Sequence, residues 1–190
     1  MSIVNHIKRP LSGSEMVKLL PGTIILTYDE LVHFDDIEFL LGKTRQFVVL
    51  YMTAETSGHW CCVFVNDTEP DKIQFFCSYG EPVDSKQFQN VPMEIMVSKN
   101  QCFSYLSELM VHSRYKHISC NNFRVQGRGV STCGRFVALR LWLKNLRDHE
   151  FFMFMNMSRY TPDKLATALT ENVFNNYPLS PLVICVPYPL

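Results

Sequence analysis

The sequence predicts a single α+β domain over residues 1–190, with a central mixed β-sheet flanked by helices. Three observations lead to this fold class. Short apolar segments of the strand type gather in the middle of the chain, and segments with helical apolar spacing lie on both sides of them. The length of 190 residues and the hydrophobic share of 47% are enough for one domain with a buried core.

Three apolar segments near the middle of the chain predict neighbouring strands: 46–52, 60–65 and 72–77. The polar stretch 66–71, which contains a proline, predicts a hairpin-like turn between the second and the third strand. A further short strand is predicted over residues 118–125.

Helix-type apolar spacing marks four segments: 28–43, 102–117, 133–146 and 162–174. The first segment closes with Gly42, a residue type that commonly ends helices. The last segment has Thr161 in the N-cap position and Pro162 as its first helical residue. The third is the strongest of the four and follows a glycine-containing loop, so a central helix is predicted to begin at about Cys133.

Composition argues against several classes of protein. Lys and Arg total 18, and Asp and Glu also total 18, whereas a dedicated nucleic-acid binder is usually basic. No apolar run reaches the ~18 residues of a membrane span, and the N-terminus lacks the apolar stretch of a secretory signal. The seven cysteines are odd in number and irregularly spaced, which favours free thiols in a reducing compartment.

No cofactor or metal ion is expected. Cys61 and Cys62 are adjacent, but neighbours in a strand point to opposite faces of the sheet. The sequence contains no C-x-x-C or H-x-x-x-H spacing, so it gives a zinc site no support.

Cys133 is the candidate nucleophile, because it stands where a glycine-containing loop passes into a helix. The N-terminus of a helix favours negative charge and lowers the pKa of a thiol. Gly134 follows directly and leaves room for a substrate backbone to approach, and Ser131 and Thr132 are candidate caps of the helix. Taken alone, Cys133 is more often a small, inert core residue.

His59 and Gln126 complete a possible hydrolytic site. His59 opens a predicted strand beside an indole, where its imidazole can face a cleft and take a proton from a thiol. Gln126 lies seven residues before Cys133, and its carboxamide can supply one oxyanion donor beside the backbone N–H of Cys133. Each residue taken alone is more simply a surface or loop side chain.

Four sequence elements occur in a characteristic order: Gly58-His59-Trp60, Phe76-Cys77-Ser78-Tyr79-Gly80, Gln126 and Cys133-Gly134. Together they resemble the cysteine protease superfamily of adenovirus-type maturation proteases and ubiquitin-like/SUMO proteases. The resemblance covers about residues 46–147. It implies a protease fold with the nucleophile at the N-terminus of a central helix.

The resemblance also implies roles for the matching residues. Cys133 would be the nucleophile, His59 the general base and then the acid, and Gln126 part of the oxyanion hole. Trp60 would shape a narrow slot over the scissile bond, next to Gly134, and admit small residues of a protein substrate.

The chain departs from the family pattern at Cys77, where the family normally has Asp, Glu or Asn. A neutral thiol is a weak hydrogen-bond partner for an imidazole. In one interpretation Cys77 or Ser78 orients His59 weakly, and in another the enzyme is slow or inactive. In the third, a carboxylate takes the role, and the candidates are Asp67, Glu69, Glu81 and Asp84.

The segment Tyr160–Leu165, followed by Leu169-Thr170, looks like proteases of virophages and Polinton-type elements. That resemblance implies a monomer that processes capsid precursors in the cytoplasm or viral factory of the host cell and in the virion. The balanced charge weakens any carry-over of DNA as an activator. A disulfide-linked peptide activator through Cys102 or Cys120 has no support in the sequence.

Two other functions stay open. One is a deubiquitinase- or SUMO-protease-like enzyme that acts on host conjugates with the same chemistry. The other is a catalytically inactive relative that serves as a binding module, for which the departure at Cys77 is the only argument.

Overall fold

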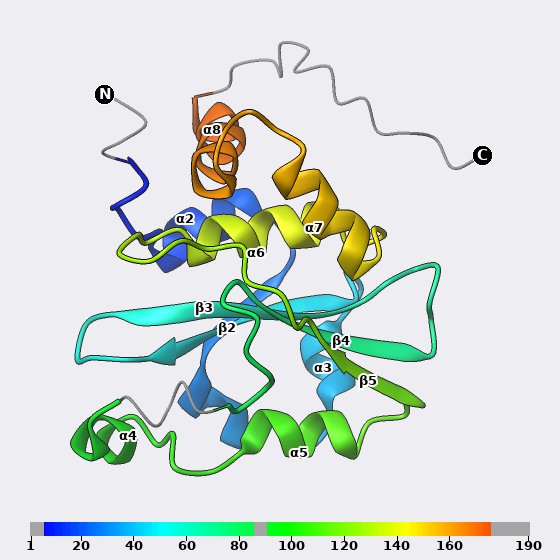
Figure 1. Cartoon of the computed structure of the whole chain (residues 1–190). Coiled ribbons are helices and arrows are strands. Elements are labelled where there is room, and N and C mark those ends of the chain that lie inside the picture. The colour runs from blue at the N-terminus through cyan, green and yellow to red at the C-terminus, as the bar shows by residue number, and fades with distance from the viewer. Residues whose placement is uncertain (1–5, 86–90, 176–190) are drawn as a thin grey trace.

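A mixed sheet of five strands runs through the middle of the molecule in the order β1-β2-β3-β4-β5 (Figure 1). The structure is a computed structural model that describes residues 6–85 and 91–175. Its strands are β1 (Ile24–Thr27), β2 (Gln46–Met52), β3 (Gly58–Val65), β4 (Lys72–Cys77) and β5 (His117–Cys120). The three central strands are antiparallel, and each outer strand runs parallel to its neighbour. The α+β fold class with a central mixed sheet is therefore confirmed.

The central strands lie where the apolar runs predict them. β2 and β4 have the predicted bounds, and β3 begins two residues earlier, so that His59 lies inside the strand. A Cβ at Gly58 would collide with the carbonyl oxygen of Tyr51 on β2, which explains why the strand begins with glycine. β5 covers only the first part of the predicted strand 118–125, and the four-residue β1 is too short for its pattern to stand out.

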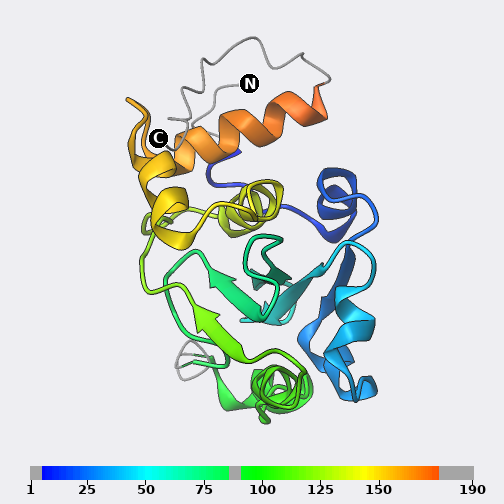
Figure 2. The same cartoon turned by 90° about the vertical axis from the view of Figure 1, so that its right-hand side faces the viewer.

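Helices cover both faces of the sheet (Figures 1 and 2). One face carries α2 (Gly13–Leu19), α6 (Cys133–Trp142), α7 (Asp148–Asn156) and α8 (Pro162–Phe174). The other side carries the 3-10 helix η1 (Tyr28–His33), α3 (Ile37–Leu41), α4 (Met93–Ser98) and α5 (Tyr105–Val111). No helix in the described part of the chain is both long and apolar enough to cross a membrane.

Two apolar cores result, one on each face of the sheet. The first includes Trp60, Cys62 and Cys133 and lies under α2, α6, α7 and α8. The second includes Cys61 and Cys77 and lies against η1, α3 and α5. Adjacent Cys61 and Cys62 thus point to opposite faces, as the strand pattern predicts.

The prediction of one helix over 28–43 is wrong. The segment forms η1 and α3, with extended backbone at Phe34 between them. The side chain of Asp36 accepts a hydrogen bond from the backbone N–H of Glu38 at 2.9 Å and caps the start of α3. Because an N-cap residue has non-helical backbone angles, it interrupts the helical pattern there. Gly42 ends α3, as predicted.

The predicted helix 102–117 is wrong at both ends and shrinks to α5. The side chains of His112 and Ser113 contact the carbonyl oxygens of Glu108 and Met110 at 2.9 and 2.6 Å. These contacts satisfy acceptors of the last turn, where the helix cannot supply its own donors. The predicted helix 133–146 ends four residues early, whereas α8 has the predicted bounds. α2, α4 and α7 were not expected.

α6 is a core helix, and all its residues from Cys133 to Leu141 are buried. Arg135 donates to Thr170 Oγ1 at 2.6 Å and Glu171 Oε1 at 2.7 Å, both on α8. A buried charge is costly unless it is paired, so these bonds fix α6 against α8.

Arg140, one residue short of the buried end of α6, donates to Asp148 Oδ1 at 3.1 Å. Its guanidinium also lies over the rings of Phe64 and Phe151, at 4.4 and 5.2 Å from their centroids. This cation fixes α6 against the start of α7 and against the sheet. The helix that begins with Cys133 is therefore held at both ends.

Candidate active site

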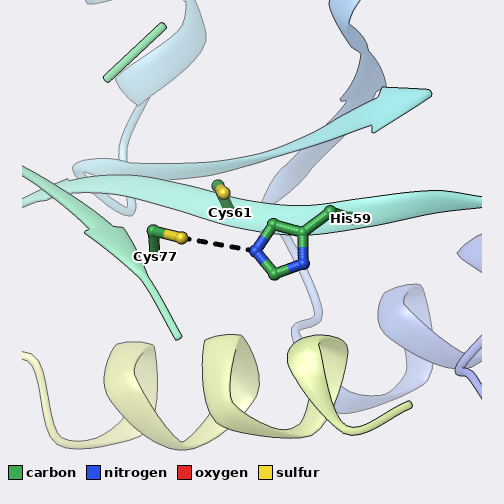
Figure 3. Close-up of side chains that lie close together, drawn as sticks. All are labelled: His59, Cys61 and Cys77. Atoms are coloured by element: carbon green, nitrogen blue, oxygen red, sulfur yellow. Dashed lines mark hydrogen bonds between the residues drawn. The ribbon is translucent and has the colours of Figure 1, made fainter. Parts of the chain in front are cut away.

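The sheet register brings three chemically reactive side chains together (Figure 3). Cys61 on β3 lies opposite Cys77 on β4, and His59 is two residues from Cys61 on the same strand. Because side chains alternate along a strand, the register groups all three. The Sγ of Cys77 lies 3.4 Å from Nε2 of His59.

Cys133 contacts His59 from the other side, because the first turn of α6 packs against the start of β3. The Cys133 thiol and the His59 imidazole are close enough to shift each other's pKa, the thiol downward and the imidazole upward. Cys133 is 5% exposed and His59 is 7% exposed, so the pair is almost closed off from water. The structure therefore brings together the two residues that were predicted as nucleophile and base.

Burial alone would lower the pKa of His59, since it disfavours the charged imidazolium. Hydrogen bonds and charge attraction from Cys133 and Cys77 outweigh burial and raise the pKa of His59 to about 10. Burial likewise acts to raise the pKa of Cys133, but the hydrogen bond and the positive charge of His59 lower it overall. At neutral pH the imidazole is protonated and faces an acidic thiol.

Cys77 is also acidic, which corrects the expectation of a neutral thiol at this position. A hydrogen bond from Cys61 contributes most, and contacts with His59 and the backbone N–H of Glu81 add to it. Despite burial, the pKa of Cys77 falls to about 4. The side chain next to His59 is therefore an anion at neutral pH, as a carboxylate would be.

The candidate carboxylates make other contacts. Asp84 Oδ1 accepts hydrogen bonds from the hydroxyls of Tyr28 and Tyr51 at 2.7 and 3.2 Å. Glu69 pairs with Lys72 at 3.1 Å. The sulfur of Cys77 is thus the anion that the described contacts place against His59.

Asp67 lies within ion-pair distance of Arg45 and Lys144, at 4.0 and 3.6 Å. Glu81 reaches the site only through its backbone N–H, which bonds to the sulfur of Cys77. Neither carboxylate has a described contact with the imidazole.

Gln126 lies near the site, but its carboxamide is already bonded. Its Oε1 accepts a hydrogen bond from Ser78 Oγ at 2.6 Å, so Ser78 contacts Gln126 rather than His59. Its Nε2 donates to Val130 O at 2.9 Å and to Tyr79 OH at 3.2 Å. The role of Gln126 as an oxyanion donor stays a prediction.

Tyr79 connects these parts and was not singled out from the sequence, although it lies in the Phe76–Gly80 motif. Its ring stacks on His59 with 4.6 Å between centroids and 13° between planes. Its hydroxyl accepts the hydrogen bond from Gln126. Burial, chiefly, raises the pKa of Tyr79, so the hydroxyl keeps its proton. The ring thus fixes one face of the imidazole.

Asp163 on α8 anchors the loop that leads to Cys133, and nothing in its local sequence indicates this. One carboxylate oxygen accepts from the backbone N–H of Gly127 at 3.0 Å, and the other from Thr132 Oγ1 at 2.5 Å. Thr132 is the N-cap of α6, but its hydroxyl is used by Asp163 rather than as a cap. The loop is therefore fastened at both ends to the first turn of α8.

Trp60 and Gly134 meet inside the first core. Trp60 Nε1 donates to the carbonyl oxygen of Leu11 at 3.0 Å. A Cβ at Gly134 would lie 3.0 Å from Trp60 Cδ1 and 3.1 Å from Met16 Sδ. The glycine thus allows close packing of the N-terminal segment on α6, which differs from the expected room for substrate. The contribution of Trp60 to a substrate slot stays a prediction.

The group of His59, Cys61 and Cys77 offers donor atoms that lie within 4.8 Å of one another, a set that suits a soft metal ion. The thiols come from opposed strands, so no C-x-x-C spacing marks them in the sequence. Within the group, Cys77 and His59 are also in direct contact with each other, at 3.4 Å.

The geometry supports nucleophilic chemistry. The Cys133 thiol, whose pKa is lowered, faces an imidazolium, which is also held by the Cys77 anion and by the stacked ring of Tyr79. A thiolate is the reactive form of cysteine, and a neighbouring imidazolium is the usual means of stabilising it.

No protein-family model matches the chain, but comparisons with curated proteins and with solved structures do give matches. The chain is 34% identical over 171 residues to uncharacterized protein V9 of Sputnik virophage, which covers 86% of this chain and 95% of that protein. It is also similar to the crystal structure of an ASFV protease, with 17% identity and a TM-score of 0.41. That similarity covers 85% of this chain and 66% of the length of the ASFV protease.

Proposed function

The chain belongs to the family of the V9 protein of Sputnik virophage, and from that premise we propose that it is a viral cysteine protease. The observation that carries the proposal is the acidic thiol of Cys133 in contact with the protonated imidazole of His59. The Cys77 anion on the far side of the ring supports activity over the alternative of an inactive relative.

In the proposed reaction the sulfur of Cys133 attacks the carbonyl carbon of the scissile peptide bond. The imidazolium of His59 gives its proton to the leaving amine as the C–N bond breaks, and a thioester remains. Water, deprotonated by the now neutral His59, attacks the thioester and releases the acid product and the thiolate.

The negative oxygen of each tetrahedral intermediate needs hydrogen-bond donors. We assign this role to the backbone N–H of Cys133, at the start of α6, and to the carboxamide of Gln126. The N–H that Gln126 now gives to Tyr79 would turn to the oxyanion, while the bond to Val130 keeps the side chain in place.

The proposed substrates are capsid or other structural precursors, cleaved during virion maturation in the host cell and in the virion. Membership of a virophage protein family supports a viral role. We also propose a small residue, often glycine, at the cleavage position, because the resemblance to the protease superfamily implies a narrow slot shaped by Trp60.

The test is to incubate the purified chain with the major capsid protein of its own virus and to map new termini. Wild-type protein is expected to produce defined termini, and Cys133→Ala none. Cys102→Ser is the matched control, because this exposed cysteine has no place in the site. Equal cleavage by Cys133→Ala would refute the assignment of the nucleophile.

Two further outcomes separate the alternatives. Rapid reaction of Cys133 with a ubiquitin-type activity probe, without cleavage of the capsid protein, would favour an enzyme that acts on host conjugates. No labelling of Cys133 by any thiol-directed probe in a folded sample would favour an inactive binding protein.

A further inference from the structure

Cys61 has no role in the proposed reaction, yet it lies directly opposite Cys77 across two antiparallel strands. Both side chains are fully buried, and neither cysteine forms a disulfide in this structure. Their sulfur atoms lie within 4.8 Å of each other. Whether a disulfide can form between Cys61 and Cys77 depends on how the two strands pair.

The backbone shows which type of cross-strand pair the two cysteines form. The N–H of Cys77 donates to Asn121 Oδ1 at 2.9 Å, and its carbonyl oxygen accepts from Asn121 Nδ2 at 2.8 Å. Both backbone groups of Cys77 therefore point toward Asn121, which follows β5, and away from β3. Cys61 and Cys77 are consequently a non-hydrogen-bonded pair of the antiparallel ladder.

Such a pair suits a disulfide. In non-hydrogen-bonded pairs the Cα atoms are about 4.5 Å apart and the side chains approach closely. Disulfides span Cα separations of roughly 4.4–6.8 Å. The neighbouring Cys62 lies opposite Phe76 and points to the other face, so it serves as an internal control.

We propose that a hydroperoxide joins Cys61 and Cys77 in a disulfide between β3 and β4, and that this reversible bond switches off the site at His59. The disulfide itself stands on the pairing of the strands, and the loss of activity rests on the proposed protease function.

The chemistry starts from the Cys77 thiolate, the stronger nucleophile of the pair at neutral pH. Its sulfur attacks an oxygen of hydrogen peroxide, the O–O bond breaks, and the hydroxide released takes the proton of His59 and becomes water. Cys77 is then a sulfenic acid. The sulfur of Cys61 attacks that of Cys77, the S–O bond breaks, and hydroxide leaves with the Cys61 proton as a second water. Two thiols are oxidised, and one peroxide is reduced to two waters.

The bond would change the charge next to His59. A disulfide sulfur carries no negative charge, so the imidazolium loses the anion of Cys77 while its burial remains. Without that support His59 becomes neutral more readily, and Cys133 loses the positive charge that keeps it acidic. A dithiol reductant would restore Cys61 and Cys77.

The test treats the full-length chain with graded hydrogen peroxide in the presence of a chelator, blocks free thiols, and maps peptides by mass spectrometry without reduction. The Cys133→Ser background removes interference from oxidation of the nucleophile. A linked pair of peptides with Cys61 and Cys77 is expected, with the loss of two hydrogens. Cys62→Ser should retain the link and Cys61→Ser should lose it, with near-ultraviolet circular dichroism to confirm that each variant is folded.

A second experiment measures the rate at which Cys133 is alkylated in the wild-type protein. After the link has formed, and excess peroxide has been removed, the rate of Cys133 alkylation at neutral pH is expected to fall on the order of tenfold, because less thiolate is present. Dithiothreitol should restore the rate. Cys62→Ser should show the same fall and the same recovery as the wild type.

Several results would overturn the proposal. One is Cys77 found as a thiol or a sulfinic acid without any disulfide to Cys61. Another is a disulfide between Cys77 and Cys133. The third is a Cys61–Cys77 disulfide that leaves the rate of Cys133 alkylation unchanged. A Cys61–Cys77 link in a chain that cleaves no substrate would refute the protease function while the disulfide stands, so the two failures are distinguishable.

Discussion

At the scale of single residues, Cys77 determines how the proposed site works. Its sulfur takes the place of a carboxylate, because the Cys61 thiol, the Glu81 backbone and His59 all stabilise its anion. A thiol with an ordinary pKa would leave the imidazole with only Cys133 as a partner. The neighbours of the Cys77 sulfur therefore decide whether this side chain carries the negative charge that stabilises the His59 imidazolium.

Cys77→Ser separates the charge of this side chain from its size, because serine is similar in shape but does not ionise. We expect kcat/KM to fall by about ten- to a hundredfold, as for the loss of a charged partner of an imidazolium. Cys77→Asp restores an anion and is expected to keep or raise the rate. The measurement is steady-state cleavage of one peptide by the three proteins, and a fully active Cys77→Ser would show that the charge is not needed.

The dependence of stability on pH follows from the same pair. The raised pKa of His59 gives stabilisation that is complete below 6.5 and lost as pH rises toward about 10. The lowered pKa of Cys77 gives stabilisation that is complete above 9.0 and lost as pH falls toward about 4. Together they predict a gain from pH 4 to 6.5, a plateau to pH 9, and a decline above it.

Urea unfolding of wild type and Cys77→Ser at a series of pH values checks this profile. The difference between the two free energies of unfolding should be largest on the plateau and should shrink below pH 6.5. A difference that stays constant down to pH 4 would mean that Cys77 is neutral in the folded protein.

At the scale of elements, the loop between Gln126 and α6 depends on α8. Asp163 holds Gly127 and Thr132 at the two ends of the loop, while Arg135 holds the first turn of α6 through Thr170. The position of Cys133 is thus determined by a helix that begins almost thirty residues later in the chain.

Asp163→Ala is expected to destabilise the chain by about 1–3 kcal/mol, because it leaves buried donors without acceptors. It should also lower activity, because the loop would no longer hold Cys133 in place. Asp163→Asn is the control, since its single oxygen can still accept one of the two bonds. Urea unfolding and hydrogen exchange at the amide of Gly127 measure the effect, and unchanged exchange in Asp163→Ala would contradict it.

The sequence predicts the middle of this fold well and its edges less well. β2, β4 and α8 stand out because an apolar run or a helical stripe coincides with one element. The segment 28–43 misleads because its apolar spacing continues through Asp36, whose side chain caps a new helix. Local capping bonds of this kind override the apolar pattern.

The sequence likewise predicts some contacts of the candidate site and misses others. The contact between His59 and Cys133 could be anticipated from the order of the motifs around them. The contact of Cys61 with Cys77, and that of Asp163 with the loop, could not, because strand register and helix packing decide them. The acidity of Cys77 depends on three neighbours that only the folded chain brings together.

At the scale of the whole molecule, positive and negative side chains balance, with 18 of each kind. Two of the positive charges, Arg135 and Arg140, are buried and paired inside the first core, so they do not face solvent. The long-range attraction that draws basic proteins to polyanions is therefore expected to be absent.

We accordingly predict that DNA does not stimulate cleavage. The rate with a peptide substrate should stay the same within a factor of about two when duplex DNA is added at low salt, where phosphate contacts are strongest. Stimulation that disappears as salt is raised would refute this and would point to a local basic surface.

The ion pair between Arg135 and Glu171 also has a consequence for the timing of biosynthesis. While the ribosome is still adding α8, Arg135 lacks its counter-ion Glu171, and burying it would be unfavourable. The nascent chain therefore cannot seat Cys133 beside His59 until residue 171 has left the ribosome, so hydrolysis is not expected to begin before that point.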